Sequence, residues 1–126
     1  MSPQELDQFA RQGYTRVPVV REVLADLDTP LSAYRKLASG PYTYLFESVQ
    51  GGERWGRYSI IGLPATEVVR ITGQQVQVDG PDGRQQEDVA DPIAWVEDYR
   101  QAYRSPDLPG LPRFNGGLVG YFGYDS

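Results

Sequence analysis

The sequence predicts an α+β domain with a mainly antiparallel sheet and flanking helices. Three stretches carry the polar residue followed by proline that starts a helix. Between the second and third of these stretches lie several short segments rich in β-branched and aromatic residues, separated by glycine-bearing turns. Strands joined by short turns pair antiparallel, whereas regular alternation with helices predicts a parallel sheet. With 126 residues, of which 40% are hydrophobic, the chain can form one domain with one modest core.

The predicted helices begin at residues that satisfy free backbone N–H groups. Ser2 and Glu5 form a capping box, and Thr29 is the expected N-cap of the second helix. Ser39-Gly40-Pro41 ends that helix, and Asp91 opens the third and longest one. The predicted ranges are Pro3–Gln12, Pro30–Ala38 and Pro92–Tyr103.

The predicted strands are rich in β-forming residues and are bounded by turn residues. Gly73 joins two of them as a hairpin pivot, and Gly80-Pro81-Asp82-Gly83 is a turn by its chemistry. An earlier β-rich stretch, Tyr14–Val20, contains Pro18 and is therefore an edge strand or an extended arm, since proline cannot donate to a ladder. The predicted strand ranges are Tyr42–Val49, Arg57–Ile61, Thr66–Thr72, Gln74–Asp79 and Arg84–Asp88.

The stretch Phe114–Asp125, FNGGLVGYFGYD, is predicted to be a strand with both faces buried. Gly116–Tyr124 is apolar at odd and even positions alike, which is typical of a strand covered on both sides. A chain of this size has little surface to cover both faces, so we expect further protein, outside this chain, to complete the sheet. The alternative is a terminal strand in the middle of a small sheet.

The composition excludes several classes of function. There is no cysteine and no histidine, which excludes disulfides, thiolate metal sites and the commonest general base. The net charge is −5 and the basic residues are scattered, which disfavours nucleic acid as a partner. No run of about 18 apolar residues could span a membrane, and the polar N-terminus does not resemble a signal peptide. We therefore expect a cytoplasmic protein.

Neither a phosphate-binding loop nor a metal site is predicted. The stretch GGLVGYFG lacks the lysine and hydroxyl residue of a Walker motif, and a β-favouring aromatic run follows its first glycines. Paired carboxylates occur at three places, but each pair is expected on a solvated surface and none has the spacing of metal ligands. These pairs are Asp26/Asp28, Glu87/Asp88 and Glu97/Asp98.

Glu47 and Ser48, toward the end of the predicted strand Tyr42–Val49, are the candidate functional residues. Ser48 has no histidine to activate it, so we expect a binding role and no catalytic one. A carboxylate attracts an ammonium group, and a hydroxyl both donates and accepts hydrogen bonds. The pair therefore suits a small zwitterion such as an amino acid. In the plainer interpretation, the two residues only mark where the strand leaves the core.

The loop after Ser48 carries further cationic and aromatic side chains. If the two predicted strands pair, this loop lies at the Ser48 end, and its side chains converge on Glu47 and Ser48. In the plainer interpretation, Glu53 and Arg54 form an exposed tip and Trp55 fills the core. The side chains concerned are Arg54, Trp55, Arg57 and Tyr58.

These residues resemble the N-terminal domain of anthranilate synthase component I, the large subunit of a chorismate-utilising enzyme. The resemblance rests on Leu45-Phe46-Glu47-Ser48 with GGERWGRYSIIG shortly after it, on the stretch FNGGLVGYFGYD, and on TPLSAYRKLA. It covers almost the whole chain. It implies that residues 1–126 form a regulatory N-terminal domain, within the larger β-sandwich fold of the chorismate-utilising enzymes.

The resemblance also implies a reaction for the complete enzyme, a lyase of tryptophan biosynthesis. That enzyme converts chorismate to anthranilate and pyruvate, using Mg²⁺ and ammonia from a glutamine amidotransferase subunit, component II. In the family, the catalytic and metal-binding residues lie in the larger C-terminal part. We therefore expect this chain to hold no catalytic residue and to be inactive alone.

The family's feedback inhibitor, L-tryptophan, is the ligand that the resemblance implies for this chain. It binds allosterically at a motif of the LLES type, which carries over to Ser48 and, by adjacency, to Glu47. Phe46 replaces the more usual leucine, a change of size beside the pocket. Some members place a lysine about ten residues after the serine; here that region reads Arg57-Tyr58, and that contact is not transferred.

Three other interpretations remain. The first is component I of aminodeoxychorismate synthase, which shares the fold, although ERWGRYSIIG favours anthranilate synthase. The second is a stand-alone regulatory module that binds an amino acid, against which the apolar stretch Gly116–Tyr124 argues. The third is an interaction module without a ligand.

Overall fold

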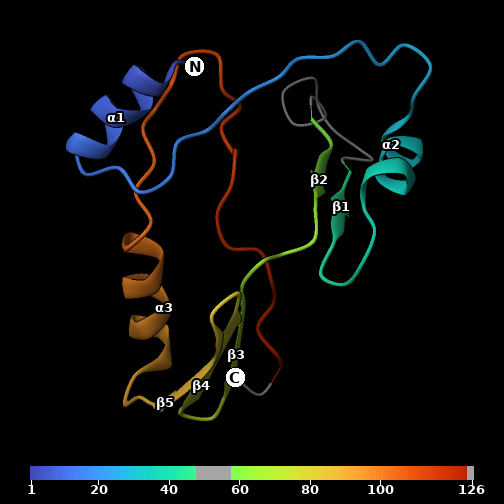
Figure 1. Ribbon diagram of the computed structural model, residues 1–126. Coiled ribbons are helices and arrows are strands. Elements are labelled where there is room, and N and C mark those ends of the chain that lie inside the picture. Colours follow the sequence, from blue (N-terminus) through green and yellow to red (C-terminus); the bar gives the residue numbers. More distant parts are fainter. Residues whose placement is uncertain (48–57, 125–126) are drawn as a thin grey trace. The chain divides into compact units, whose positions relative to one another are not determined.

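A computed structural model of the chain describes residues 1–47 and 58–124. Within these residues the elements follow the order α1, α2, β1, β2, β3, β4, β5, α3 (Figure 1). The strands form two sheets, one of β1 and β2 and the other in the order β3–β4–β5. The described part of the chain therefore confirms the predicted α+β class, with helices and strands segregated along the sequence.

Two compact units make up the chain. The first contains α1 and α3, and the second contains α2, β1 and β2, while the strands β3 to β5 supply residues to both. The first unit comprises Met1–Arg21, Ile71–Gln77 and Gln86–Ser126, and the second comprises Glu22–Arg70 and Val78–Gln85.

The helices begin where the caps predict. The Ser2 hydroxyl accepts the Glu5 N–H at 3.2 Å, and the Glu5 carboxylate accepts the Ser2 N–H at 2.8 Å, which completes the capping box. Asp91 caps α3 by accepting the N–H groups of Ile93 and Ala94. The helices are α1, Pro3–Arg11, α2, Pro30–Leu37, and α3, Pro92–Gln101.

The first sheet is the predicted pair of strands, with shorter paired segments. β1, Tyr44–Phe46, runs antiparallel to β2, Ile60–Gly62. The register sets Tyr44 opposite Gly62, Leu45 opposite Ile61 and Phe46 opposite Ile60. The far ends of the predicted strands, at residues 48–49 and 57, lie outside the described residues.

The second sheet confirms the predicted meander. Gly73 is the first residue of the two-residue loop between β3 and β4, and it adopts the positive φ of 60° that this position of the turn requires. Val76 is 1% exposed and is the fully buried apolar side chain of the described core, whereas β5 is exposed along its whole length. The strands are β3, Val68–Thr72, β4, Gln75–Gly80, and β5, Gly83–Asp88.

The proline-interrupted stretch Tyr14–Val20 is an extended arm and not a strand. The N–H groups of Thr15 and Arg16 both donate to the carbonyl oxygen of Arg104, at 2.8 and 3.0 Å. Arg104 in turn donates its N–H to the Thr15 hydroxyl at 2.8 Å. These bonds attach the arm to the residues just after α3. Pro18 has no backbone N–H, but the N–H groups that form these bonds belong to Thr15 and Arg16, so the proline does not interrupt them.

The predicted buried strand at residues 114–124 is absent from the structure, so that expectation is wrong for this chain. The segment has no regular secondary structure, and its side chains are exposed, with Tyr121 at 94% and Tyr124 at 103%. A strand exists only where a neighbouring strand accepts and donates its backbone hydrogen bonds. The two described sheets are formed by β1 to β5 alone, so this apolar segment has no ladder to join.

Candidate functional site

Glu47 follows β1 directly and is exposed. It is the first residue beyond the paired part of the strand, whereas the sequence predicted it inside the strand Tyr42–Val49. Ser48 lies outside the described residues, and so do Arg54, Trp55 and Arg57. The predicted convergence of these side chains on Glu47 stays a prediction. Of the predicted group around Glu47, Tyr58 is described, and it is exposed.

Two paired strands hold the segment that leads to Glu47. The Tyr44 ring lies so close to Gly62 that a Cβ atom there would collide with it. A cross-strand aromatic residue covering a glycine packs against bare backbone, and this requires glycine at position 62. The paired register ends at Phe46 and Ile60, one residue before Glu47.

Helix α2 contributes a second attachment, just before β1. The hydroxyl groups of Tyr34 and Thr43 are 2.9 Å apart and share a hydrogen bond in a partly buried position. Since Thr43 is the residue before β1, this bond connects the helix to the start of the strand. The strand that ends at Glu47 is therefore held at its beginning by α2 and along its length by β2.

An aromatic pair lies on one side of this strand. The ring centroids of Tyr44 and Phe46 are 4.8 Å apart, with their planes inclined by 33°. Alternation along the strand puts both rings on one face and Leu45 on the other, with Glu47 next on the Leu45 side. The strand end thus carries an exposed carboxylate on one face and an aromatic pair on the other, and the carboxylate is the group that can bind the ammonium group of a small zwitterion.

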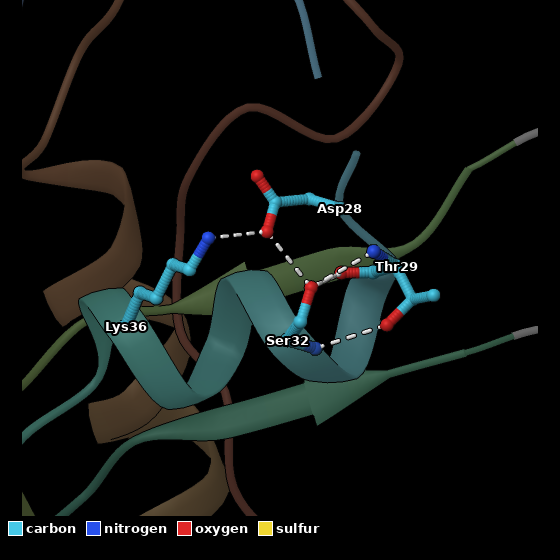
Figure 2. Close-up of polar contacts among 4 residues, drawn as sticks. All are labelled: Asp28, Thr29, Ser32 and Lys36. Atoms are coloured by element: carbon cyan, nitrogen blue, oxygen red, sulfur yellow. Dashed lines mark hydrogen bonds and ion pairs between the residues drawn. The ribbon is translucent and has the colours of Figure 1, made fainter. Parts of the chain in front are cut away.

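The N-terminal end of α2 is fixed by a polar network (Figure 2). The Asp28 carboxylate accepts hydrogen bonds from the Lys36 ammonium group at 2.7 Å and from the Ser32 hydroxyl at 2.9 Å. Thr29 and Ser32 cap each other's backbone N–H groups, at 3.1 and 2.9 Å. The hydrogen bond from Lys36, and next the one from Ser32, hold the pKa of Asp28 below its usual value.

A second network, which the sequence pattern did not predict, lies across β3, β4 and β5. Asp79 accepts from Arg70 at 2.8 Å with one oxygen and from Arg84 at 2.7 Å with the other. Arg70 also donates to the Tyr42 hydroxyl and lies over its ring, 5.5 Å from the centroid. The Asp79–Arg84 pair could have been inferred from the sequence, because the two residues flank the predicted turn Gly80–Gly83. The contact between Arg70 and Tyr42 could not, because these residues are 28 positions apart.

The three predicted carboxylate pairs lie on the surface, and one member of each has a partner. Lys36 contacts Asp28, as described above, the Trp95 indole N–H donates to Glu87 at 2.6 Å, and Arg100 contacts Glu97 at 2.5 Å. Among residues 1–47 and 58–124, no three Asp or Glu side chains gather as a metal site would need. No helix in the same residues is long and apolar enough to cross a membrane.

Nearly the whole chain is similar to curated proteins named anthranilate synthase component 1. It is 57% identical over 127 residues to the one from Pseudomonas aeruginosa, which covers 99% of this chain and 26% of that protein. It is 51% identical over 126 residues to the one from Neisseria meningitidis serogroup B, covering 100% and 26%. For the Acetivibrio thermocellus protein the identity is 41% over 114 residues, covering 90% and 23%. The chain thus spans about a quarter of the length of these relatives. No protein-family model matches the chain, and no solved structure matches it.

Proposed function

We propose that this chain, which is related over nearly its whole length to the anthranilate synthase component 1 proteins, contributes Glu47 and Ser48 to a feedback site for L-tryptophan. The observation that carries the proposal is the position of Glu47. It is exposed, and it lies one residue past a strand pair that is held from two sides. The sequence Leu45-Phe46-Glu47-Ser48 at this strand end is the motif of the expected tryptophan site.

The chemistry of the strand end suits a zwitterionic ligand such as an amino acid. The Glu47 carboxylate can accept hydrogen bonds from the ligand's ammonium group, and the Ser48 hydroxyl can donate to its carboxylate. The Tyr44 and Phe46 rings lie on the other face of the strand from Glu47, so the apolar surface for the ligand's side chain would come from other residues. Charge-assisted bonds of this kind supply more binding free energy than neutral ones, so both residues should matter for affinity.

At the full length of its relatives, we propose that the protein makes anthranilate and pyruvate from chorismate in the cytoplasm, with ammonia supplied by a glutamine amidotransferase subunit. The relatives reported above carry the anthranilate name, which favours this reaction over aminodeoxychorismate formation. Residues 1–126 would be the regulatory N-terminal domain of that protein.

Mg²⁺ belongs to the proposed reaction, but the described residues do not fit a site for it. They bring no three carboxylates together, and Asp79, Asp28 and Glu97 are each engaged by cationic side chains. We therefore propose that the ligands of the metal and of chorismate belong to the part of the full-length protein that this chain does not include. No catalytic step is assigned to residues of this chain.

Regulation would follow from mutual coupling between the two ligands. If tryptophan favours one arrangement of the regulatory domain, it weakens chorismate binding, and chorismate weakens tryptophan binding by the same factor. This reciprocity gives a check on the proposal that does not depend on the rate of turnover.

Titration calorimetry of L-tryptophan into the full-length protein tests the proposal. Ser48→Ala should weaken binding by about tenfold or more, since it removes a hydrogen bond to a charged group. Glu47→Gln keeps the shape of the side chain but removes its charge, and should weaken binding similarly. Ser105→Ala is the matched control, because Ser105 is an exposed serine of the other compact unit and should leave affinity unchanged. Unchanged affinity in both Glu47 and Ser48 variants would exclude the proposed site.

A further inference from the structure

We infer that Arg70 is a positioning residue for the Glu47 end of β1, and that it acts through the backbone of Tyr42. This inference rests on the proposed function, because it concerns the geometry of the same tryptophan site. It assigns a role to a side chain on β3, which the sequence motif does not include.

The inference begins with the backbone of Tyr42. Its φ angle is 60°, in the left-handed region, and it is the one non-glycine residue among the described residues with a positive φ. A bulky residue adopts this conformation at a cost in free energy, because its Cβ atom crowds the following carbonyl oxygen. Such a conformation persists only when surrounding contacts enforce it.

Arg70 supplies the contact that can enforce it. Its guanidinium group donates a hydrogen bond to the Tyr42 hydroxyl and lies 5.5 Å from the centre of the Tyr42 ring. Arg70 is itself oriented by Asp79, at 2.8 Å, and Asp79 is oriented from the other side by Arg84, at 2.7 Å. The Tyr42 ring is therefore held by a chain of three charged side chains on neighbouring strands, all within one compact unit.

The backbone of Tyr42 sets the direction in which the chain enters β1. Only one residue, Thr43, separates it from Tyr44, the first paired residue of the strand. The strand has three paired residues, and its start is also attached to α2 by the Tyr34–Thr43 hydrogen bond, so the strand moves as one short unit when its entry direction changes. A rotation at Tyr42 would shift Tyr44 against Gly62, where there is no room, and would pass along the strand to Glu47.

Loss of the Arg70 side chain should therefore let Tyr42 return to an ordinary φ angle and displace Glu47. Tryptophan binding would weaken, although Arg70 does not touch the ligand. Substitutions at positions that act only through intervening residues change ligand affinity by roughly twofold to thirtyfold.

The test has a ligand-free part and a ligand-binding part, both on Arg70→Met. By NMR of the 126-residue chain, the variant should lose the left-handed backbone signature of Tyr42 and shift the Glu47 amide resonance. In the full-length protein, L-tryptophan affinity should fall by roughly threefold to tenfold. Arg35→Met is the matched control, since Arg35 is an exposed arginine of α2 whose side chain makes no hydrogen bond or ion pair to a described residue.

A rescue experiment separates positioning from a general loss of stability. Glycine adopts positive φ angles without a penalty, so Tyr42→Gly in the Arg70→Met background should restore most of the tryptophan affinity. Tyr42→Phe, which keeps the ring and removes only the hydroxyl, is the milder variant and should show a smaller shift of the Glu47 amide. An unchanged Tyr42 conformation in Arg70→Met, or a loss of affinity that glycine does not rescue, would overturn the inference. If the wild-type protein binds no tryptophan, the proposed function fails, while the ligand-free NMR result still decides whether Arg70 positions β1.

Discussion

The Tyr44 ring lies against Gly62, its partner across the antiparallel pair of β1 and β2. This contact fills the place that a side chain at position 62 would occupy. It joins the two strands within three residues of Glu47, so the site that we propose depends on a glycine in the opposite strand. Packing between strands, and not only the motif itself, therefore determines where the Glu47 carboxylate lies.

Gly62→Ala should destabilise the chain, because the new methyl group overlaps the Tyr44 ring. We expect a loss of about 1–3 kcal/mol in the free energy of unfolding, the usual cost of overpacking, measured by urea denaturation. Gly120→Ala is the control, since a Cβ atom there meets nothing within 4 Å and the residue has no positive φ. Equal stability of the two variants would mean that Tyr44 moves aside at little cost.

The Asp28–Lys36 pair should make stability depend on pH in the acidic range. The folded-state pKa of Asp28 is lowered from its usual value of 3.8, chiefly by the Lys36 hydrogen bond. Its contribution to stability is therefore fully present above this usual value and is lost as the pH falls through the lower, folded-state pKa. Asp28→Asn should reduce stability at neutral pH and flatten the acidic part of the pH profile, measured by urea denaturation from pH 7 to pH 2.

A matched control is available two residues away. Asp26 is exposed and has no ion pair with a described residue, so Asp26→Asn should leave the profile close to that of the wild type. Lys36→Met should resemble Asp28→Asn, because it removes the other partner. Profiles of Asp28→Asn and Asp26→Asn that coincide would show that the pair contributes nothing measurable, as many exposed ion pairs do.

The 126-residue chain by itself should form no anthranilate from chorismate, Mg²⁺ and ammonium ions. Its described residues offer no cluster of metal-binding carboxylates, and the whole sequence contains no histidine to act as a general base. Anthranilate fluorescence measures the product directly, with the full-length protein as the positive control. Product formation in proportion to the concentration of the short chain would contradict this expectation and would require a catalytic residue within residues 1–126.

The elements that sequence analysis predicted well are those set by short-range chemistry. Ser2 and Glu5 cap each other across one helical turn, so their pattern alone determines where α1 begins. Gly73, the predicted hairpin pivot, has the positive φ that its hairpin needs. In each case the interacting groups lie within a few residues of one another.

The elements that it predicted poorly depend on partners far away in the sequence. Residues 114–124 have the composition of a buried strand, yet they are exposed and unpaired with either described sheet. For the candidate site, the motif led directly to Glu47 but not to Arg70 or Tyr42, because neither belongs to it. Their contact joins β3 to the residues before β1, and no local pattern encodes it.

Local residue chemistry was sufficient to predict the α+β class, the helix starts, the hairpin turns and the motif at positions 45–48. Three features are seen only in the folded chain: the register that sets Tyr44 against Gly62, the positive φ of Tyr42, and its attachment to Arg70. The two groups of features differ in how far apart their interacting residues lie in the sequence. Caps and turns are satisfied within the same few residues, whereas the position of a strand end depends on side chains that folding brings together from distant segments.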